Sequence, residues 1–246
     1  MSTRELAWGL HPVREALQRA PERVLELWTQ AGRSDDRMSE ILALAGAEGI
    51  KCQAVRRETL DGMAGGGAHQ GVVARLAPVA ALDENDLYEL LDRLQSPAFL
   101  LVLDGVQDPH NLGACLRTAD AAGVHAVIIP KDRAAGLTPA ARKAAAGAAE
   151  TVPLVQVVNL ARCLRGLKDR GIWLAGAEAG GESALQADLA GPLALVLGAE
   201  GGGLRRLTRE TCDLLVSLPM KGAVESLNVS VAAGVLLYLA LAQRGG

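Results

Sequence analysis

The polar residues best suited to chemistry fall into three separated segments of the C-terminal part. The first, residues 104–120, reads D-G-V-Q-D-P-H-N-L-G-A-C-L-R-T-A-D and follows an apolar strand into a helix. Asn111 is placed to cap that helix, and Arg117 lies opposite its apolar stripe, where it is available to an anionic ligand. A capped helix with one solvated arginine explains the same residues without any ligand.

The second segment, residues 195–204, reads L-V-L-G-A-E-G-G-G-L, so that a buried strand ends in Gly198, Glu200 and three further glycines. Glycine lets a ligand approach the backbone closely and contact its N–H groups. The segment is not the G-x-G-x-x-G dinucleotide fingerprint, and none opens a βαβ unit elsewhere, which argues against a dinucleotide-dependent oxidoreductase. The residues indicate either a ligand loop of another kind or a flexible turn with a solvated glutamate.

The third segment, residues 218–230, reads L-P-M-K-G-A-V-E-S-L-N-V-S and leads from a strand into the last helix, which Ser226 is predicted to cap. From 229 to 242 this helix is V-S-V-A-A-G-V-L-L-Y-L-A-L-A, apolar on almost every side. Such a helix must be covered all round, and a sheet covers one side only. A second copy of the chain is the simplest cover for the other side, so the pattern predicts a homodimer through the C-terminal helix region.

The elements that must position these segments alternate between strand and helix from residue 97 onward. The strand candidates are Phe99–Leu103, Ala126–Ile129, Thr151–Val157, Ile172–Ala177, Leu193–Leu197 and Leu214–Leu218. The helix candidates are Asn111–Ala122, Pro139–Ala149, Leu160–Asp169, Leu204–Thr211 and Leu227–Gln243. Near-continuous apolar strands alternating with helices predict an α/β fold with a mostly parallel sheet covered on both faces. Ligands of such sheets bind beyond the carboxyl ends of the strands, here in the loops after Leu103, Ala177, Leu197 and Leu218.

The first 75 residues or so are predicted to form a separate, small α/β module. Helical spacing runs from His11 to Arg19, and a second helix follows the cap formed by residues 34–36. Strand-like runs cover residues 23–29, 50–55 and 71–76. Residues 78–96 indicate a linker that becomes a helix and ends before Pro97.

The net charge, the cysteine pattern and the apolar runs exclude several classes of protein. The net charge of −3 gives no global attraction to nucleic acid, so any RNA contact must come from local basic patches. The four cysteines are scattered without a C-x-x-C pair, which argues against a zinc ribbon or a redox motif and indicates free, buried thiols. There is no signal-peptide pattern and no apolar run of the roughly 20 residues that span a bilayer. We expect a cytoplasmic protein that requires no metal ion and does not associate with a membrane.

Taken together, the Asn111-to-Arg117 spacing, G-A-E-G-G-G-L and S-L-N-V-S resemble the three ordered motifs of the SpoU/TrmH methyltransferases, members of the SPOUT class. W-G-L-H-P-V-R-E-A-L near the start and H-Q-G-V-V-A-R at residues 69–75 resemble the N-terminal RNA-binding domain of the family members that methylate a guanosine of 23S rRNA. The resemblance covers essentially the whole chain.

The resemblance implies a domain division and an activity. Residues 1–77 would form an RNA substrate-binding domain similar to the L30e/L7Ae fold, residues 78–96 the linker with its helix, and residues 97–246 a catalytic domain with a trefoil knot. The activity would be S-adenosylmethionine-dependent methylation of the ribose 2′-hydroxyl of a guanosine in the peptidyl-transferase-centre loop of 23S rRNA. Methylation of tRNA or of another rRNA nucleotide is an alternative within the family. A non-catalytic rRNA-binding assembly factor is an alternative from another class.

The resemblance also implies roles for single residues. The methyl donor would be held by the backbone at Gly198, Leu218, Met220 and Leu227. Arg117 would act as the base or as a phosphate-anchored group that aligns the hydroxyl. Charge stabilisation and phosphate anchoring rank first and proton removal second, because a guanidinium group normally stays protonated. The residues that would fix Arg117 and the donor are Asn111, Glu200, Ser226 and Asn228. No metal is required, because the sulfonium already makes the methyl group electrophilic.

Basic residues of both parts are the candidate RNA contacts. They are Lys131, Arg133, Arg142 and Lys143 in the catalytic part and Arg14, Arg33, Arg56 and Arg57 in the N-terminal part. Each of them could equally belong to a solvated face. Aromatic residues make up only 2% of the chain, so recognition by shape and phosphate contacts is expected rather than by base stacking.

Overall fold

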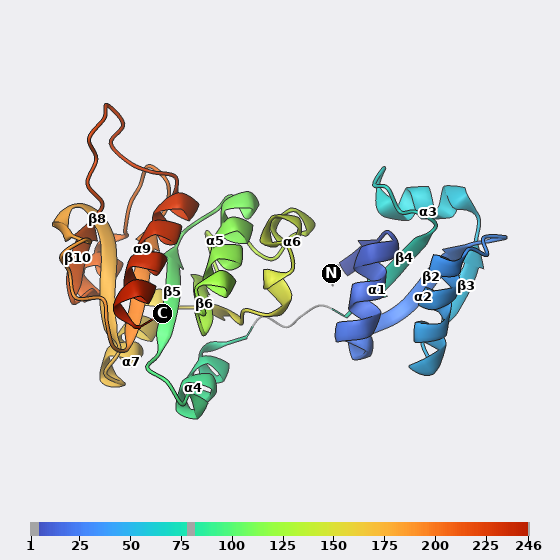
Figure 1. Ribbon diagram of the computed structural model, residues 1–246, viewed down its shortest axis with the longest axis horizontal. Helices are drawn as coiled ribbons and strands as arrows, with labels where there is room; N and C mark the ends of the chain where they lie inside the picture. The colour runs from blue at the N-terminus through green and yellow to red at the C-terminus, as the bar shows by residue number, and fades with distance from the viewer. Residues whose placement is uncertain (1–4, 78–81, 246) are drawn as a thin grey trace. The chain divides into compact units, whose positions relative to one another are not determined.

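The computed structural model describes residues 5–77 and 82–245, which belong to two compact units, Met1–Ala80 and Ala81–Gly246 (Figure 1). The predicted linker, residues 78–96, therefore falls partly outside the described residues. Its helix is α4 (Glu84–Arg93), which Asp83 caps and whose Leu87 is buried in the core of the second unit. The predicted domain boundaries and the knot implied by the resemblance stay predictions.

The described residues of the N-terminal unit, 5–77, form a four-stranded mixed sheet with three α-helices. Its elements are β1 (Glu5–Trp8), α1 (Leu10–Arg19), the short 3₁₀ helix η1 (Pro21–Arg23), β2 (Val24–Gln30), α2 (Asp36–Ala47), β3 (Cys52–Val55), α3 (Arg57–Ala64) and β4 (Val72–Leu76). The strand order is β1-β4-β2-β3, in which β2 and β3 are parallel and the other described pairs are antiparallel. The sequence patterns predicted α1, α2 and the last three strands but missed β1 and α3, which are short and carry little periodic signal.

The C-terminal unit is built on a six-stranded sheet in which every pair is parallel, in the order β10-β8-β9-β5-β6-β7. Its strands are β5 (Phe99–Asp104), β6 (Ala126–Pro130), β7 (Leu154–Val157), β8 (Trp173–Ser183), β9 (Leu193–Gly198) and β10 (Leu214–Ser217). Besides α4, its helices are α5 (Pro109–Ala121), α6 (Pro139–Ala145), the 3₁₀ helix η2 (Ala148–Glu150), α7 (Leu160–Asp169), α8 (Arg206–Thr211) and α9 (Val229–Gln243). The predicted α/β architecture is confirmed.

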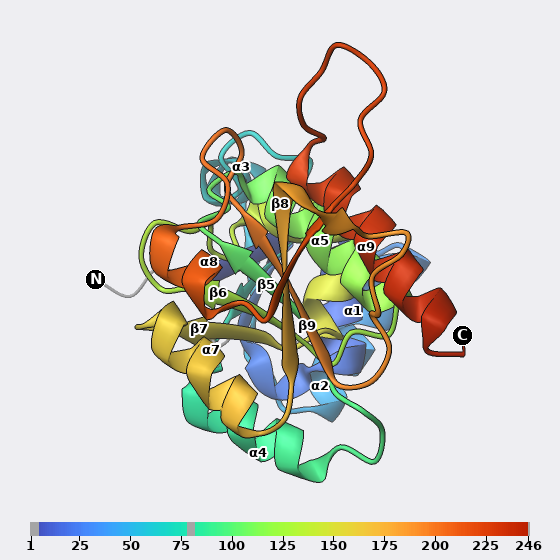
Figure 2. The ribbon, with the colours of Figure 1, turned by 90° about the vertical axis from the view of Figure 1, so that its left-hand side faces the viewer.

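The apolar strands bury both of their faces, as continuous apolar runs in parallel sheets predict. In β5, Leu101 and Leu103 join a core formed with α5, α6 and α9, whereas Leu100 and Val102 face a second core formed with α4 and α7. Figure 2 shows α4 and α7 on one side of this sheet and α5 and α9 on the other.

Some local predictions were wrong for identifiable reasons. The predicted helix 139–149 ends at Ala145, because Ala146 takes a left-handed φ of 51°, and the following strand accordingly begins only at Leu154. β8 continues past Ala177 to Ser183, so the loop expected after Ala177 does not exist.

All four cysteines are free. Cys115 and Cys163 are buried as predicted, but Cys52 is exposed in β3. In the described part of the chain, no helix has the length and apolarity needed to cross a bilayer.

Candidate active site

The structure brings three of the predicted catalytic residues into one hydrogen-bonded network. The Nδ2 group of Asn111 donates to Glu200 Oε1 at 2.9 Å. The Nδ2 group of Asn228 donates to the same oxygen at 2.7 Å and to Asn111 Oδ1 at 3.0 Å. These residues come from α5, from the loop after β9 and from the residue before α9, so one carboxylate joins all three sequence segments.

The sequence had suggested that Asn111 caps its helix, and this prediction was wrong. Because Asn111 is not the cap, its side chain is free to enter this network. Asp108 is the N-cap, and its carboxylate accepts the His110 N–H at 2.9 Å. Pro109 occupies the first helical position, where its missing N–H costs nothing. Asn111 lies within the first turn, and its side chain is buried against the network instead of turning back to the backbone.

Asn228 is held from the other side by its own helix. It is the N-cap of α9, a role that the sequence had assigned to Ser226. Its Oδ1 accepts the Ser230 N–H at 2.9 Å and the Ser230 hydroxyl at 2.6 Å. Its amide group is thereby oriented so that Nδ2 faces Glu200. Ser230 is a supporting residue that the sequence reasoning missed, although a serine two positions after an N-cap asparagine is a recognisable signal.

The loop that carries Glu200 folds back tightly on itself. Ala199 and Gly203 exchange two backbone hydrogen bonds, at 3.2 and 3.0 Å. A Cβ atom on Gly198 would lie 2.0 Å from the carbonyl carbon of Gly203, so only glycine fits at the base of the loop. Gly198 thus allows two parts of the backbone to approach each other closely, whereas the approach of a ligand to this segment stays a prediction.

Glu200 also affects the buried thiol of Cys115, on α5. Burial is the main cause that raises the pKa of Cys115 to about 12, and the negative charge of Glu200 raises it further. Cys115 therefore stays a neutral packing residue at physiological pH and does not compete as a nucleophile.

Arg117 lies on α5 but outside the network. Its side chain is exposed, and its guanidinium makes no hydrogen bond or ion pair with any residue that the structure describes. The interpretation that Arg117 is available to an external ligand agrees with this position. Ser226 is also exposed, in the loop between β10 and α9, and joins no part of the network.

The four residues predicted to hold the methyl donor lie at the carboxyl end of β9 or in the loop that follows β10. Gly198 ends β9, while Leu218 and Met220 follow β10 and are partly buried. Leu227 is 39% exposed, just before α9. Figure 1 shows the loop between β10 and α9 projecting beyond the sheet.

The candidate RNA-binding residues differ in how far their charge is already neutralised. Arg14 pairs with Glu40, Arg33 with Asp35 and Arg142 with Glu150. Arg57 lies 4.0 Å from Asp61 in an exposed pair. Lys131, Arg133, Lys143 and Arg56 are exposed and form no ion pair with a described residue.

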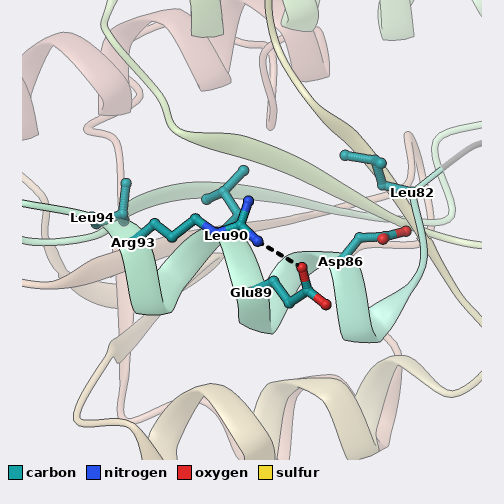
Figure 3. Close-up of a pocket in the computed structure, with 6 residues that line it drawn as sticks. All are labelled: Leu82, Asp86, Glu89, Leu90, Arg93 and Leu94. Atoms are coloured by element: carbon teal, nitrogen blue, oxygen red, sulfur yellow. Dashed lines mark hydrogen bonds and ion pairs between the residues drawn. The ribbon is translucent and has the colours of Figure 1, made fainter.

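Neither of two cavities involves the network. One of about 390 Å³ is lined by α4 residues, Leu82 and Leu94, and the Arg93–Glu89 ion pair lies in its wall (Figure 3). The other, of about 220 Å³, lies between α1 and α2. Among the described residues, no group of three or more His, Cys, Asp or Glu side chains could hold a metal ion.

Two family models match the chain and divide it as its two compact units do. The model of the SpoU rRNA Methylase family matches residues 98–238, and the model for RNA 2′-O ribose methyltransferase substrate binding matches residues 6–81. The first match covers more than half of the chain and includes every residue of the hydrogen-bonded network.

The chain belongs to the SpoU rRNA methylase family.

Two curated relatives are similar to it over nearly their whole length. The 23S rRNA (guanosine-2′-O-)-methyltransferase RlmB of Shewanella oneidensis is 53% identical over 245 residues, 99% of both chains. RlmB of Escherichia coli K12 is 52% identical over 241 residues, 98% of this chain and 99% of its own.

Solved SpoU structures have the same fold. The SpoU methyltransferase AviRb from Streptomyces viridochromogenes, in complex with AdoMet, matches with a TM-score of 0.78 and 26% identity over 97% of this chain and 89% of its own. The A. aeolicus TrmH/SpoU tRNA modifying enzyme matches with a TM-score of 0.55 and 30% identity over 66% of this chain and 82% of its own.

Proposed function

We propose that this SpoU protein is a cytoplasmic methyltransferase that transfers a methyl group from S-adenosylmethionine to the ribose 2′-hydroxyl of a guanosine in 23S rRNA. The observation that carries the proposal is the 53% identity to RlmB over 99% of both chains. An assembly factor that had lost catalysis would be expected to lose Arg117, Glu200 or Asn228, yet all three are present, and Asn228 and Glu200 are hydrogen-bonded to each other. A tRNA substrate is less well supported, because the tRNA modifying enzyme matches only 66% of this chain.

The residues at the carboxyl edge of the sheet fit S-adenosylmethionine. A Cβ atom added to Gly201 or Gly202 would have no atom within 4 Å apart from those of the glycine itself and its two chain neighbours, so the backbone there is open to a ligand. Leu218, Met220 and Leu227 add partly exposed apolar surface suited to an adenine ring. We therefore assign donor binding to Gly198, Leu218, Met220 and Leu227. The bound donor supplies a methyl group activated by its sulfonium.

The chain itself must position the ribose and stabilise the charge that develops on its oxygen. A 2′-hydroxyl is a poor nucleophile until it loses its proton. Because a guanidinium group normally carries a positive charge, Arg117 is assigned to a backbone phosphate of the RNA and to the developing oxyanion. Asn111, Glu200 and Asn228 hold three segments in place relative to one another. These segments are the start of α5, the glycine-rich loop after β9 (residues 199–204) and the start of α9. Preorganisation of this kind lowers the barrier without a metal ion.

The active form is proposed to be a homodimer that forms through α9. One face of this helix is buried in the core through Ala233, Leu236 and Leu237. The other face exposes Val231 (51%), Val235 (40%) and Tyr238 (50%), one helical turn apart from each other. A contiguous apolar stripe on a helix is typical of an association surface.

The proposed substrate is tested by methyl transfer and by mapping. Purified protein with labelled S-adenosylmethionine should label protein-free or partly assembled 23S rRNA, and not tRNA. Ribose methylation should also be mapped in RNA from cells that lack the protein. If no 2′-O-methyl group disappears from 23S rRNA, the substrate proposal is wrong.

A further inference from the structure

β5 ends in a charged residue that is completely buried. Every residue of the strand from Phe99 to Asp104 is buried, and the Asp104 side chain is 0% exposed. A carboxylate in such a place is costly unless hydrogen bonds or an opposite charge compensate it. The partners of Asp104 therefore indicate what the residue is for.

Among the described residues, Arg205 makes both contacts with this carboxylate, one through its backbone and one through its side chain. The backbone N–H of Arg205 donates to Asp104 Oδ2 at 3.0 Å. The guanidinium Nη1 lies 3.5 Å from Oδ1, and Oδ1 is buried with no hydrogen bond from any described residue. The charge of Asp104 is thus balanced by a single residue that lies 101 positions further along the chain.

Arg205 directly follows the glycine-rich loop, and Asp104 also lies beside the start of that loop. In the parallel pairing of β5 with β9, Asp104 is in register with Gly198. The loop therefore leaves the sheet next to Asp104, turns back through the Ala199–Gly203 pairing and ends on the Asp104 carboxylate. Asp104 closes the loop at its base.

A loop of this composition needs such a closure. Gly201 and Gly203 have φ values of 72° and 60°, and glycine loses more backbone entropy on ordering than any other residue. Glu200 lies in the middle of this loop, and its carboxylate must reach Asn111 and Asn228. Any loosening at the base of the loop would displace Glu200 and the open glycine backbone together.

We propose that Asp104 is a positioning residue that holds the glycine-rich loop in the conformation required for donor binding. Asp104 acts through Arg205 and does not touch the donor. The donor part of this inference rests on the proposed function, whereas the ordering of the loop does not. Neutralising Asp104 should therefore loosen the loop even without ligand and weaken donor binding as a consequence.

The test uses three variants of the full chain and a matched control. Asp104→Ala removes both interactions, and Asp104→Asn keeps an acceptor for the Arg205 N–H but removes the charge. Arg205→Ala keeps the backbone donor, and the Arg205 side chain is 44% exposed, so the variant should fold.

The control is Asp213→Asn. Asp213 likewise accepts a backbone N–H, from Leu174 at 2.9 Å, and pairs with Lys168 at 2.8 Å, but lies at the opposite edge of the sheet, just before β10.

Two measurements are made on each protein. Hydrogen–deuterium exchange by mass spectrometry reports on the loop peptide 198–205 in the absence of ligand, and titration calorimetry gives the Kd for S-adenosylmethionine. We expect exchange of this peptide to rise about tenfold in Asp104→Ala, with the Kd weakened by about tenfold. Asp104→Asn and Arg205→Ala should fall between this variant and wild type. Asp213→Asn should lower the Tm without changing either value.

The outcomes separate the two proposals. If the wild-type protein does not bind S-adenosylmethionine, the proposed function fails, and the exchange data still test the role of Asp104. If wild type binds the donor but loop exchange and Kd in the Asp104 and Arg205 variants match the Asp213→Asn control, Asp104 is only a structural residue and the inference is overturned.

Discussion

The side chains of Asn111 and Glu200 are hydrogen-bonded at 2.9 Å although 89 residues separate them in the sequence. The bond ties the first turn of α5 to the loop after β9, and Asn228 completes the network from the start of α9. Glu200 Oε1 is the shared acceptor, so the network depends on this carboxylate more than on either asparagine.

Removing the Glu200 carboxylate should therefore cost catalysis more than stability. Glu200→Ala deletes the acceptor of both amide groups, and a misplaced loop is expected to lower kcat by about 10²-fold. Glu200→Gln keeps a carbonyl oxygen in the same place and should retain more activity. The side chain is exposed, so the Tm should change little in either variant. Equal kcat values for Glu200→Ala and wild type would show that the network does not position the reaction.

Arg117 should contribute to the transition state and not to donor binding. We expect Arg117→Ala to lower kcat by about 10²- to 10³-fold while the Kd for S-adenosylmethionine stays unchanged. Arg117→Lys keeps the charge but not the planar guanidinium, so it should restore RNA affinity better than kcat. Single-turnover methylation and calorimetry measure the two quantities separately. Undiminished methyl transfer in Arg117→Ala would contradict the proposed mechanism.

The alternation of apolar strands and helices was enough to predict the parallel sheet. The order of the strands could not be predicted, because β9 and β5 pair through segments almost a hundred residues apart. The network itself was predicted only as a set of motif positions. No local pattern states that Asn228 Nδ2 faces Glu200.

Helix caps were the least predictable part of the site. Asn111 and Ser226 both have good N-cap side chains, yet Asp108 and Asn228 take those positions. In each case several capping residues stand within a few positions, and tertiary packing decides between them. The sequence analysis did not single out Asp104 for a similar reason, because its partner Arg205 lies 101 residues further along the chain.

The thiols should react in a pattern set by burial. Burial is the first cause that raises the pKa values of Cys115, Cys163 and Cys212 to about 12. At pH 8 we therefore expect a thiol reagent to modify the exposed Cys52 alone in the folded protein, and all four thiols in guanidinium chloride. Rapid modification of more than one thiol per native chain would contradict this expectation.

The same shifts predict alkaline destabilisation. The folded pKa values of these three thiols lie above the ordinary value of 9.0, so the unfolded chain releases protons that the folded chain still holds. The free energy of unfolding should then fall as the pH rises from about 9 towards 12. Replacing Cys163 by Ala should make this fall shallower, as urea titrations at several pH values would detect.

Basic residues that have no acidic partner should dominate the electrostatic part of RNA binding. Lys131 and Arg133 form no ion pair with a described residue, whereas Arg14 pairs with Glu40 at 3.6 Å. Replacing Lys131 and Arg133 together by Ala should weaken RNA binding. The slope of log K against log salt concentration should become shallower by about 0.7 to 0.9 for each RNA phosphate that the variant no longer neutralises. Arg14→Ala should have a smaller effect on both quantities. Identical salt slopes for the double variant and wild type would remove these two residues from the RNA interface.

The exposed face of α9 should decide whether the chain is a monomer or a dimer. Val231, Val235 and Tyr238 follow one another at helical spacing and are 51%, 40% and 50% exposed in a single chain. If this stripe is the interface, a buried unpaired charge within it should prevent association. Wild type should therefore sediment as two 25.5-kDa chains and Val235→Glu as one. The matched control is Val158→Glu, because Val158 is 76% exposed and lies outside α9. A Val235→Glu variant with the mass of wild type, or a control that dissociates as well, would place the interface elsewhere.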